Sequence, residues 1–296
     1  MEKKLVVYSN DFNFMPLPIL TELEMNLFIN IICNIKKSRE FKCSFDDFYK
    51  QVNDKRNLVK EEIIAYFKEF ANKLLKYAIE FSVKDREYSL FVCFEKIQLI
   101  KEKDNTYTLI VKIQEDFFDL ITNQQLGFTQ FELCEFMSIT GKYAKSLYRL
   151  LKQFRNTGKV LCFTQDWQKF CELMQIPETY TLQSNIDNRI INPAITELSK
   201  YFKNLRYQKI KDTKSKGRGG KVIGIEFYFK AEKEPIKAEE KTSKPNSKPK
   251  KIYITETETN IKTTYFKTEE EKAEYIRNKA KKNQNTISNI NSEIAK

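Results

Sequence analysis

The sequence predicts an α+β fold built from two tandem units, each of which ends in a β-hairpin, followed by a flexible charged C-terminal tail. Helical patterns that lead into β-rich runs occur twice along the 296 residues, and apolar residues make up 41% of the chain, enough for two hydrophobic cores. After Lys230 the composition shifts to Lys, Glu, Pro and Ser. We therefore predict units at 1–125 and 126–232, and a disordered linker and charged tail at 233–296.

The first unit is predicted to run helix, strand, helix, helix, hairpin. Its first helix opens at a capping box, in which the side chains of Thr21 and Glu24 bond each other's backbone. A turn at 103–105 joins the two strands of the hairpin. The expected elements are helices over 21–37, from 44 and over 58–78, and strands over 41–43, 87–100 and 106–113. This order is that of a winged helix, in which the third helix contacts DNA and the hairpin forms the wing.

The pattern then repeats in the second unit, where helices again lead to a reader helix and then to a hairpin. Its last helix, over 182–201, contains Pro193, which implies either a kink or a helix boundary at that point. A basic, glycine-containing loop over 211–220 would form the tip of the wing. The expected elements are helices over 129–137, 141–156, 165–175 and 182–201, and strands over 202–210 and 221–230. Two tandem winged-helix domains are therefore expected.

The charge distribution points to a polyanionic partner. The formal net charge is +12. Residues 140–159 hold six Lys or Arg and no acidic residue, and residues 199–230 hold ten against two. A domain that folds these two segments together would gather them on one face, where they would attract nucleic acid.

The lack of histidine removes most classes of catalytic and metal site. No cysteine cluster replaces the missing imidazoles, so zinc is not expected, and Ser-His-Asp or Cys-His catalysis is excluded. We expect no metal, no cofactor and no enzymatic activity. The six cysteines are widely spaced, which is typical of reduced thiols in a cytoplasmic protein. Because the chain has neither a run of 18 apolar residues nor a signal-peptide pattern, no membrane association is expected.

The polar face of the 182–201 helix has an unusual composition. An apolar stripe that includes Ile186, Ile190 and Leu198 would pack inward. The opposite face carries amides, a hydroxyl and an arginine, which can bond base edges in the major groove. Reader helices present such side chains in their N-terminal half. The predicted base-reading residues are Gln183, Ser184, Asn185, Asn188 and Arg189.

Phosphate contacts are predicted from two basic surfaces. On the 141–156 helix four cations recur at spacings of three and four residues and so share one face. The predicted wing tip adds further cations beside glycines that allow the backbone to approach a groove closely. Such contacts fix the register of a protein on DNA and supply salt-dependent affinity. The predicted phosphate-binding residues are Lys142, Lys145, Arg149, Lys152, Lys214, Lys216, Arg218 and Lys221.

Three stretches of the second unit are similar to motifs of a known family. Residues 141–154, GKYAKSLYRLLKQF, are similar to its SKYA..LY.LLKQ helix, with Gly141 in place of the usual serine. Residues 188–199, NRIINPAITELS, and 216–227, KGRGGKVIGIEF, are similar to its RVL.PAI.EIN and KGRKV..I.F motifs. In this order and spacing, the chain resembles the initiator Rep proteins of iteron-containing bacterial plasmids over residues 5–230. The first unit matches more loosely, and the tail is not covered.

This resemblance implies tandem winged helices that bind directly repeated origin sites, called iterons, as monomers. By position, Arg189 matches a base-reading arginine of the family motif. The resemblance further implies homodimers that form through the first domain and repress the initiator's own gene. Bound monomers would help to open an adjacent A·T-rich segment and recruit the host initiator protein and the replicative helicase. The near-neutral charge of the first unit fits a dimer interface better than a main DNA anchor.

Two other functions stay open on the sequence. A winged-helix transcriptional repressor without an origin role would also bind double-stranded DNA, and opening of A·T-rich DNA would distinguish the two. A nuclease with a carboxylate metal site would use Asp46 and Asp47, or Glu61 and Glu62, although adjacent acids at a helix start more often interact with the helix dipole. A membrane-surface role is the weakest alternative, because neither basic segment adjoins an exposed apolar stripe.

Overall fold

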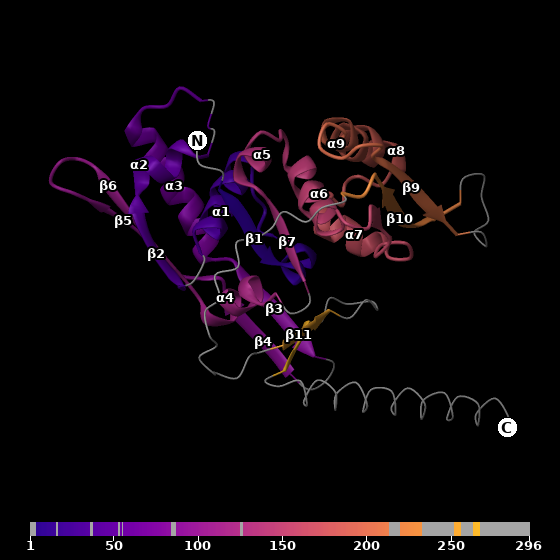
Figure 1. Ribbon diagram of the computed structural model, residues 1–296, viewed down its shortest axis with the longest axis horizontal. Helices are drawn as coiled ribbons and strands as arrows, with labels where there is room; N and C mark the ends of the chain where they lie inside the picture. Colours follow the sequence, from indigo (N-terminus) through magenta and orange to yellow (C-terminus); the bar gives the residue numbers. More distant parts are fainter. Residues whose placement is uncertain are drawn as a thin grey trace.

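The computed structural model shows two winged-helix units that lie side by side, with their wings at opposite ends of the molecule (Figure 1). It describes residues 4–232 apart from 16, 36–37, 53, 55, 84–86, 125–126 and 213–219, together with residues 252–255 and 263–266. No helix within these ranges is long and apolar enough to cross a membrane.

The first unit is a winged helix with an additional hairpin. Strands β3 and β4 form this hairpin between α3 and the wing, which consists of β5 and β6. The elements are β1 (Leu5–Ser9), the 3-10 helix η1 (Asn10–Phe14), α1 (Glu22–Asn34), β2 (Glu40–Ser44), α2 (Phe45–Lys50), α3 (Lys60–Leu75), β3 (Ala78–Val83), β4 (Glu87–Val92), β5 (Phe94–Lys101), β6 (Tyr107–Ile113) and α4 (Glu115–Thr122).

The second unit follows with β7 and four helical segments before its wing, the last of which is the continuous helix α8–η2–α9. Strands β9 and β10 form that wing, and the short β8 joins their sheet. The elements are β7 (Phe128–Glu132), α5 (Leu133–Met137), α6 (Lys142–Gln153), β8 (Lys159–Val160), α7 (Trp167–Met174), α8 (Gln183–Ile186), the π-helix η2 (Asp187–Ile191), α9 (Asn192–Leu198), β9 (Arg206–Lys211) and β10 (Val222–Tyr228).

The two units have matching topology. Their sheets run in the orders β2-β6-β5 and β8-β10-β9, so in each a single strand pairs with the second strand of the wing. In chain order α1 corresponds to α6, α2 to α7, and α3 to the continuous helix α8–η2–α9. The predicted tandem winged-helix fold is confirmed, and the third helix of each unit lies where a reader helix is expected.

The residues predicted to begin two helices of the first unit, Thr21 and Ser44, are confirmed as helix caps. The Thr21 backbone N–H donates to Glu24 Oε2 at 2.7 Å, and the Glu24 N–H donates to Thr21 Oγ1 at 3.2 Å, which completes the capping box of α1. The hydroxyl of Ser44 accepts from the Asp47 N–H at 3.3 Å and caps α2.

Strand β7 belongs to the packing of the first unit. It pairs antiparallel with β1, from Leu5 opposite Glu132 to Ser9 opposite Phe128. The helix predicted from 129 is therefore wrong up to Glu132, because residues 128–132, which include two phenylalanines and a threonine, pair with β1. The helix begins only at Leu133. Packing is continuous across the boundary predicted between 125 and 126.

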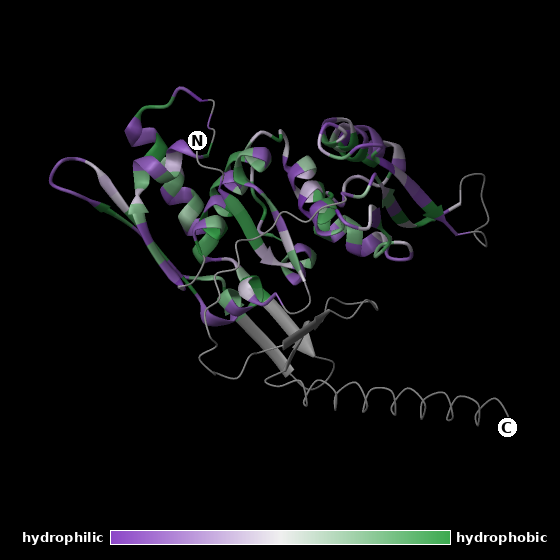
Figure 2. Ribbon diagram, viewed as in Figure 1, coloured by the Kyte–Doolittle hydropathy of each residue, from purple (hydrophilic) through white to green (hydrophobic). Residues whose placement is uncertain are grey.

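A chain of aromatic side chains connects the cores of the two units. Tyr8 meets Phe131 at 5.9 Å between ring centroids, Phe131 meets Tyr148 at 5.3 Å, and Tyr148 meets Phe202 at 5.8 Å. All four rings are buried in one hydrophobic core. Figure 2 shows hydrophobic residues along β1 and α1 at the centre of the molecule and a largely hydrophilic β9 near its outer end. Edge-to-face aromatic contacts of this kind favour a fixed arrangement of the two units.

The reader helix of the second unit accommodates Pro193 without breaking. Proline has no N–H, and its ring would clash with the carbonyl of Arg189, four residues earlier. The segment before Asn192 widens into the π-helix η2, in which the Asn192 N–H bonds the carbonyl of Asp187, five residues back. The helix is therefore continuous from Gln183 to Leu198.

Three further predictions differ from the structure. The run over 87–100 is two strands, because β4 pairs with β3 whereas β5 pairs with β6, and β3 begins at Ala78, where a helix was expected to end. Disorder over 233–296 is wrong for the strands β11 (Ile252–Thr255) and β12 (Thr263–Phe266), which form an antiparallel hairpin. Their β-branched and aromatic residues favour strands. The rest of that region, like the wing tip at 213–219, lies outside the described residues.

We expect Cys134 to be the first cysteine to react with a thiol reagent. All six cysteines are free thiols, and Cys134 is exposed whereas Cys33 and Cys93 are buried. Burial raises the pKa of Cys162 to about 12 and of Cys171 to about 11, so these two stay protonated and unreactive at pH 8. Titration with Ellman's reagent should show one fast thiol. Cys134→Ser should abolish that fast phase. A fast phase that survives would show that one of the buried or partly buried cysteines reacts instead.

Candidate nucleic-acid interface

The exposed face of the reader helix α8–η2–α9 carries most of the polar side chains that the sequence predicted to read bases. Ser184, Asn188 and Arg189 are exposed, whereas Gln183 and Asn185 are half-buried. The inward stripe is buried as predicted: Ile186, Ile190, Ile191, Ala194 and Leu198. The helix therefore presents hydroxyl, amide and guanidinium groups to solvent, which are the groups that hydrogen-bond base edges.

Strand β9 of the wing holds this helix through two side chains. Lys209 Nζ donates to Gln183 Oε1 at 2.7 Å and forms an ion pair with Asp187 Oδ1 at 2.6 Å. Tyr207 Oη donates to Asn192 Oδ1 at 2.9 Å. These bonds fix the reader helix relative to the wing. The ion pair also neutralises the acidic residue in the N-terminal half of the reader helix.

Gln183 and Arg189 are restrained differently. Gln183 Oε1 accepts from Lys209, which uses one of the two lone pairs of the amide oxygen and fixes the orientation of the amide. The second lone pair and the N–H groups remain for a base edge. Arg189 lies with its Cζ 5.7 Å from the centroid of the Tyr180 ring and stays exposed. That contact keeps the guanidinium near the helix while leaving its donors accessible.

The basic stripe of α6 faces the interior, so the prediction that it contacts phosphate is wrong for three of its four residues. Lys145 is fully buried, and its Nζ donates to the carbonyl of Phe136 at 2.7 Å. Lys152 is also buried and forms ion pairs with Glu135 at 3.1 Å and Glu232 at 3.4 Å. These cations satisfy groups of the protein itself and are not available to a ligand.

Arg149 is the third buried cation of the stripe. Its Nε donates to Tyr8 Oη at 3.2 Å and its Nη2 donates to the carbonyl of Phe12 at 3.0 Å. Tyr8 Oη donates in turn to Asn13 Oδ1 at 2.9 Å. Burial raises the pKa of Tyr8, although the charge of Arg149 opposes the rise. Of the four stripe residues, Lys142 alone stays partly exposed.

Exposed cations gather instead at the end of the reader helix and along the wing. Lys221 is exposed, as a phosphate contact requires. The positive segment 199–230 also holds five exposed cations that the sequence analysis did not name as phosphate contacts: Lys200, Lys203, Arg206, Lys211 and Lys230. Three predicted wing-tip residues lie outside the described residues: Lys214, Lys216 and Arg218. Positive charge at this interface therefore comes from 199–230 and not from α6.

Comparison with known protein families matches both units. Residues 5–152 match the family described as Initiator Replication protein, WH1, and residues 166–229 match the one described as Initiator Rep protein, WH2. The chain belongs to the initiator replication protein family. The resemblance inferred from the motifs of the second unit is thus confirmed. The match to the first winged helix extends through α6, in agreement with the pairing of β1 with β7.

Two relatives of this initiator replication protein cover most of its length. A probable replication protein rep of Bifidobacterium longum (strain NCC 2705) is 27% identical over 241 residues, which are 80% of this chain and 76% of the relative. The crystal structure of the Pi initiator protein in complex with iteron DNA is similar with a TM-score of 0.55 and 16% identity, over 79% of this chain and 100% of that one. The second likeness shows a shared fold.

The third helix of this initiator's first unit has a different surface from that of the second. The exposed residues of α3 include Glu61, Glu62 and Glu69 alongside Lys68 and Lys73. This mixture of charges lacks the run of amides and hydroxyls on the second reader helix, so fewer of the side chains on α3 can bond base edges. The third helices of the two units occupy equivalent positions but therefore expose different kinds of side chain.

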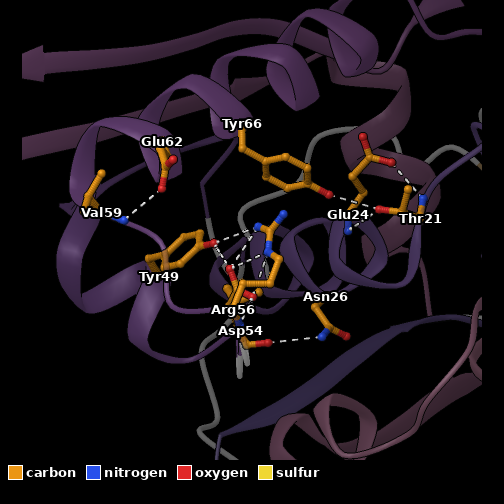
Figure 3. A network of polar contacts seen from close by, with 10 residues as sticks. Thr21, Glu24, Asn26, Tyr49, Asp54, Arg56, Val59, Glu62 and Tyr66 are labelled. Carbon is orange, nitrogen blue, oxygen red and sulfur yellow. Dashed lines mark hydrogen bonds and ion pairs between the residues drawn. The ribbon is translucent and has the colours of Figure 1, made fainter.

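A polar network fixes the loop that leads into α3 (Figure 3). Arg56 donates to Asp54 at 2.9 Å, and its Cζ lies 4.3 Å from the centroid of the Tyr66 ring. Tyr66 Oη is 3.0 Å from Thr21 Oγ1, which ties the loop to the start of α1. Tyr49 Oη donates to Asp54, and burial together with that bond raises the pKa of Tyr49 to about 12. The start of α3 is thus positioned by side chains from three elements.

The carboxylates considered for a nuclease site act locally in the fold. Asp46 forms an ion pair with Lys60 at 3.1 Å, and Glu62 Oε2 accepts from the Val59 N–H at 3.1 Å. Among the residues that the structure describes, no group of three or more His, Cys, Asp or Glu side chains is placed to hold a metal ion.

Proposed function

We propose that this initiator binds directly repeated sites at a plasmid origin as a monomer, with the helix α8–η2–α9 in the major groove. The observation that carries the proposal is the exposed face with Ser184, Asn188 and Arg189, which the wing holds through Lys209. The match to initiator Rep families and the likeness to an initiator crystallised with iteron DNA support it. The exposed cations of the wing would bind phosphate and fix the register.

Membership of the initiator replication protein family supports a further proposal about the later steps of initiation. We propose that bound monomers help to open an adjacent A·T-rich segment and recruit the host initiator protein and helicase. Homodimers would form through the first unit, whose near-neutral surface suits protein contact, and would repress the initiator's own gene. All of these steps would take place on plasmid DNA in the bacterial cytoplasm.

A salt-titrated binding assay tests the DNA partner. The full chain is mixed with DNA that flanks its own gene and with a scrambled duplex of the same composition. Discrete, regularly spaced footprints on a directly repeated segment are expected, with affinity that falls linearly with salt on logarithmic axes. Equal binding to both duplexes would contradict the origin-binding proposal.

A second assay separates an initiator from a repressor that has no origin role. Permanganate modifies unpaired thymines, so an initiator bound to its repeats should make thymines in the neighbouring A·T-rich segment reactive. Footprints without any such reactivity, on supercoiled DNA supplied with the host initiator protein, would favour the transcriptional repressor.

Replacing Arg189 with alanine should weaken specific binding by about 1–3 kcal/mol and relax the preference at one base pair, because a guanidinium can bond guanine in a bidentate way. The measurement is a competition assay over all four base pairs at each position of the footprint. Lys221→Ala is the matched control. It should weaken specific and scrambled DNA alike and lower the salt slope by about one. Unchanged discrimination by Arg189→Ala would show that another helix reads the bases.

A further inference from the structure

Leu182 is an exposed apolar residue at the start of the reader helix. Its side chain is 61% exposed, and it occupies the N-cap position of α8, where it cannot form a side-chain cap. Ser, Thr, Asp and Asn are strongly preferred at N-caps, and leucine is among the least favoured residues there. The fold alone therefore explains neither the apolar character of this residue nor its position.

The first unit repeats this feature at the equivalent position. Val59 is 59% exposed and is the N-cap residue of α3, where it also forms no side-chain cap. Its backbone N–H donates to Glu62 Oε2, as Figure 3 shows, but valine has no acceptor to return that bond. Within the described part of the chain, six large apolar side chains are exposed: Ile19, Val59, Val92, Phe128, Leu161 and Leu182. Two of the six thus stand at the same position of the two reader helices.

The surroundings of Leu182 are those of a base-reading surface. Ser184, two residues later, is exposed, and Arg189 and Asn188 follow on the exposed part of the same helix. In a helix-turn-helix the N-terminal residues of the reader helix approach the base edges. An exposed leucine at this end would therefore lie at the floor of the major groove.

We infer that Leu182 is a specificity-determining residue that packs against the 5-methyl group of a thymine, and that Val59 does the same for the first unit. This inference rests on the proposed function. The thymine methyl is the apolar group that base pairs present in the major groove, so an aliphatic side chain distinguishes T·A from the other pairs by burying it. A serine or aspartate at the same place would cap the helix better but would lose that contact.

The test compares thymine with uracil, which lacks only the 5-methyl group. A duplex is first selected from a random library by the full chain, and each thymine is then replaced singly by uracil. One replacement is expected to weaken binding of the natural protein about fourfold, the loss that corresponds to roughly one buried methyl group. Leu182→Ser should bind the thymine duplex about fourfold more weakly and lose no further affinity on that replacement. Val59→Ser should do the same at a second thymine.

The controls separate this role from folding. Leu182→Ser should have a melting temperature equal to or above that of the natural protein, because serine caps the helix. Leu161→Ser, the same change at another exposed leucine, should keep the full uracil penalty at every position.

The outcomes also separate the inference from the proposed function. If the library yields a preferred duplex but Leu182→Ser retains every uracil penalty, the inference is overturned and specific binding stands. If no duplex is preferred over a scrambled one, the proposed function fails and the inference fails with it.

Discussion

Replacing Arg149 with alanine is expected to lower the free energy of unfolding by about 3 kcal/mol, because it removes two hydrogen bonds from a charged donor and leaves buried acceptors unpaired. The side chain is 4% exposed and joins α6 to the hydroxyl of Tyr8 and the carbonyl of Phe12. It also lies 4.6 Å from the centroid of the Phe12 ring, a contact that alanine cannot replace. The folded fraction should bind DNA with unchanged affinity and salt slope.

Urea unfolding followed by circular dichroism measures the stability, and titration with the selected duplex measures the affinity of the folded protein. Lys142→Ala is the matched control from the same helix. Because Lys142 is partly exposed, its removal should change the free energy of unfolding by less than about 0.5 kcal/mol. An Arg149→Ala protein of normal stability but reduced salt slope would instead support the phosphate contact predicted from the sequence.

Arg149 was predicted to contact phosphate but is buried. This difference shows which information a local sequence pattern does not contain. Four cations at helical spacing share a face whatever that face contacts, so the spacing correctly predicted the stripe. The groups that bond Arg149 come from β1 and η1, and Tyr8 is 141 residues from Arg149 in sequence. The periodicity of residues within a helix contains no information about a partner so far away in the sequence. Residues 128–132 form a strand for a similar reason, because they pair with β1, which is also distant in the sequence.

Features that depend on neighbouring residues could be predicted. The capping box of Thr21 and Glu24 is a contact between residues three apart, and the buried stripe of the reader helix follows from apolar spacing. Pro193 is an intermediate case. Its missing N–H predicted a disturbance of the helix, but not that the preceding turn would widen into a π-helix while Ile190 and Ile191 stay buried.

The composition of the exposed face of α8–η2–α9 could be predicted from the sequence, but the side chains that hold this helix in place could not. The amides and Arg189 are local to one helix, whereas Lys209, which fixes Gln183 and neutralises Asp187, comes from the wing. In the sequence, Lys209 was one cation of a positive segment. Its role follows only from the packing of β9 against the helix.

Lys209→Met is therefore expected to reduce specific DNA affinity about 100-fold, an effect of about 3 kcal/mol, because placing like charges against each other at an interface costs several kcal/mol. The Lys209 side chain is 12% exposed, so it acts mainly within the protein, and its loss would leave the negative charge of Asp187 uncompensated in the helix that is proposed to bind DNA. It would also release Gln183 from its fixed orientation.

The double variant Asp187→Asn, Lys209→Met distinguishes this role from a direct phosphate contact. The double variant should bind the specific duplex at least tenfold more tightly than Lys209→Met does, because the repulsion disappears with the carboxylate. Lys211→Met, an exposed lysine on the same strand, is the matched comparison. Lys211→Met should lower the salt slope by about one. Adding Asp187→Asn to it should not restore affinity for the specific duplex. If Asp187→Asn rescues both lysine variants equally, Lys209 contributes only general positive charge, and the reader helix does not depend on the wing for its orientation.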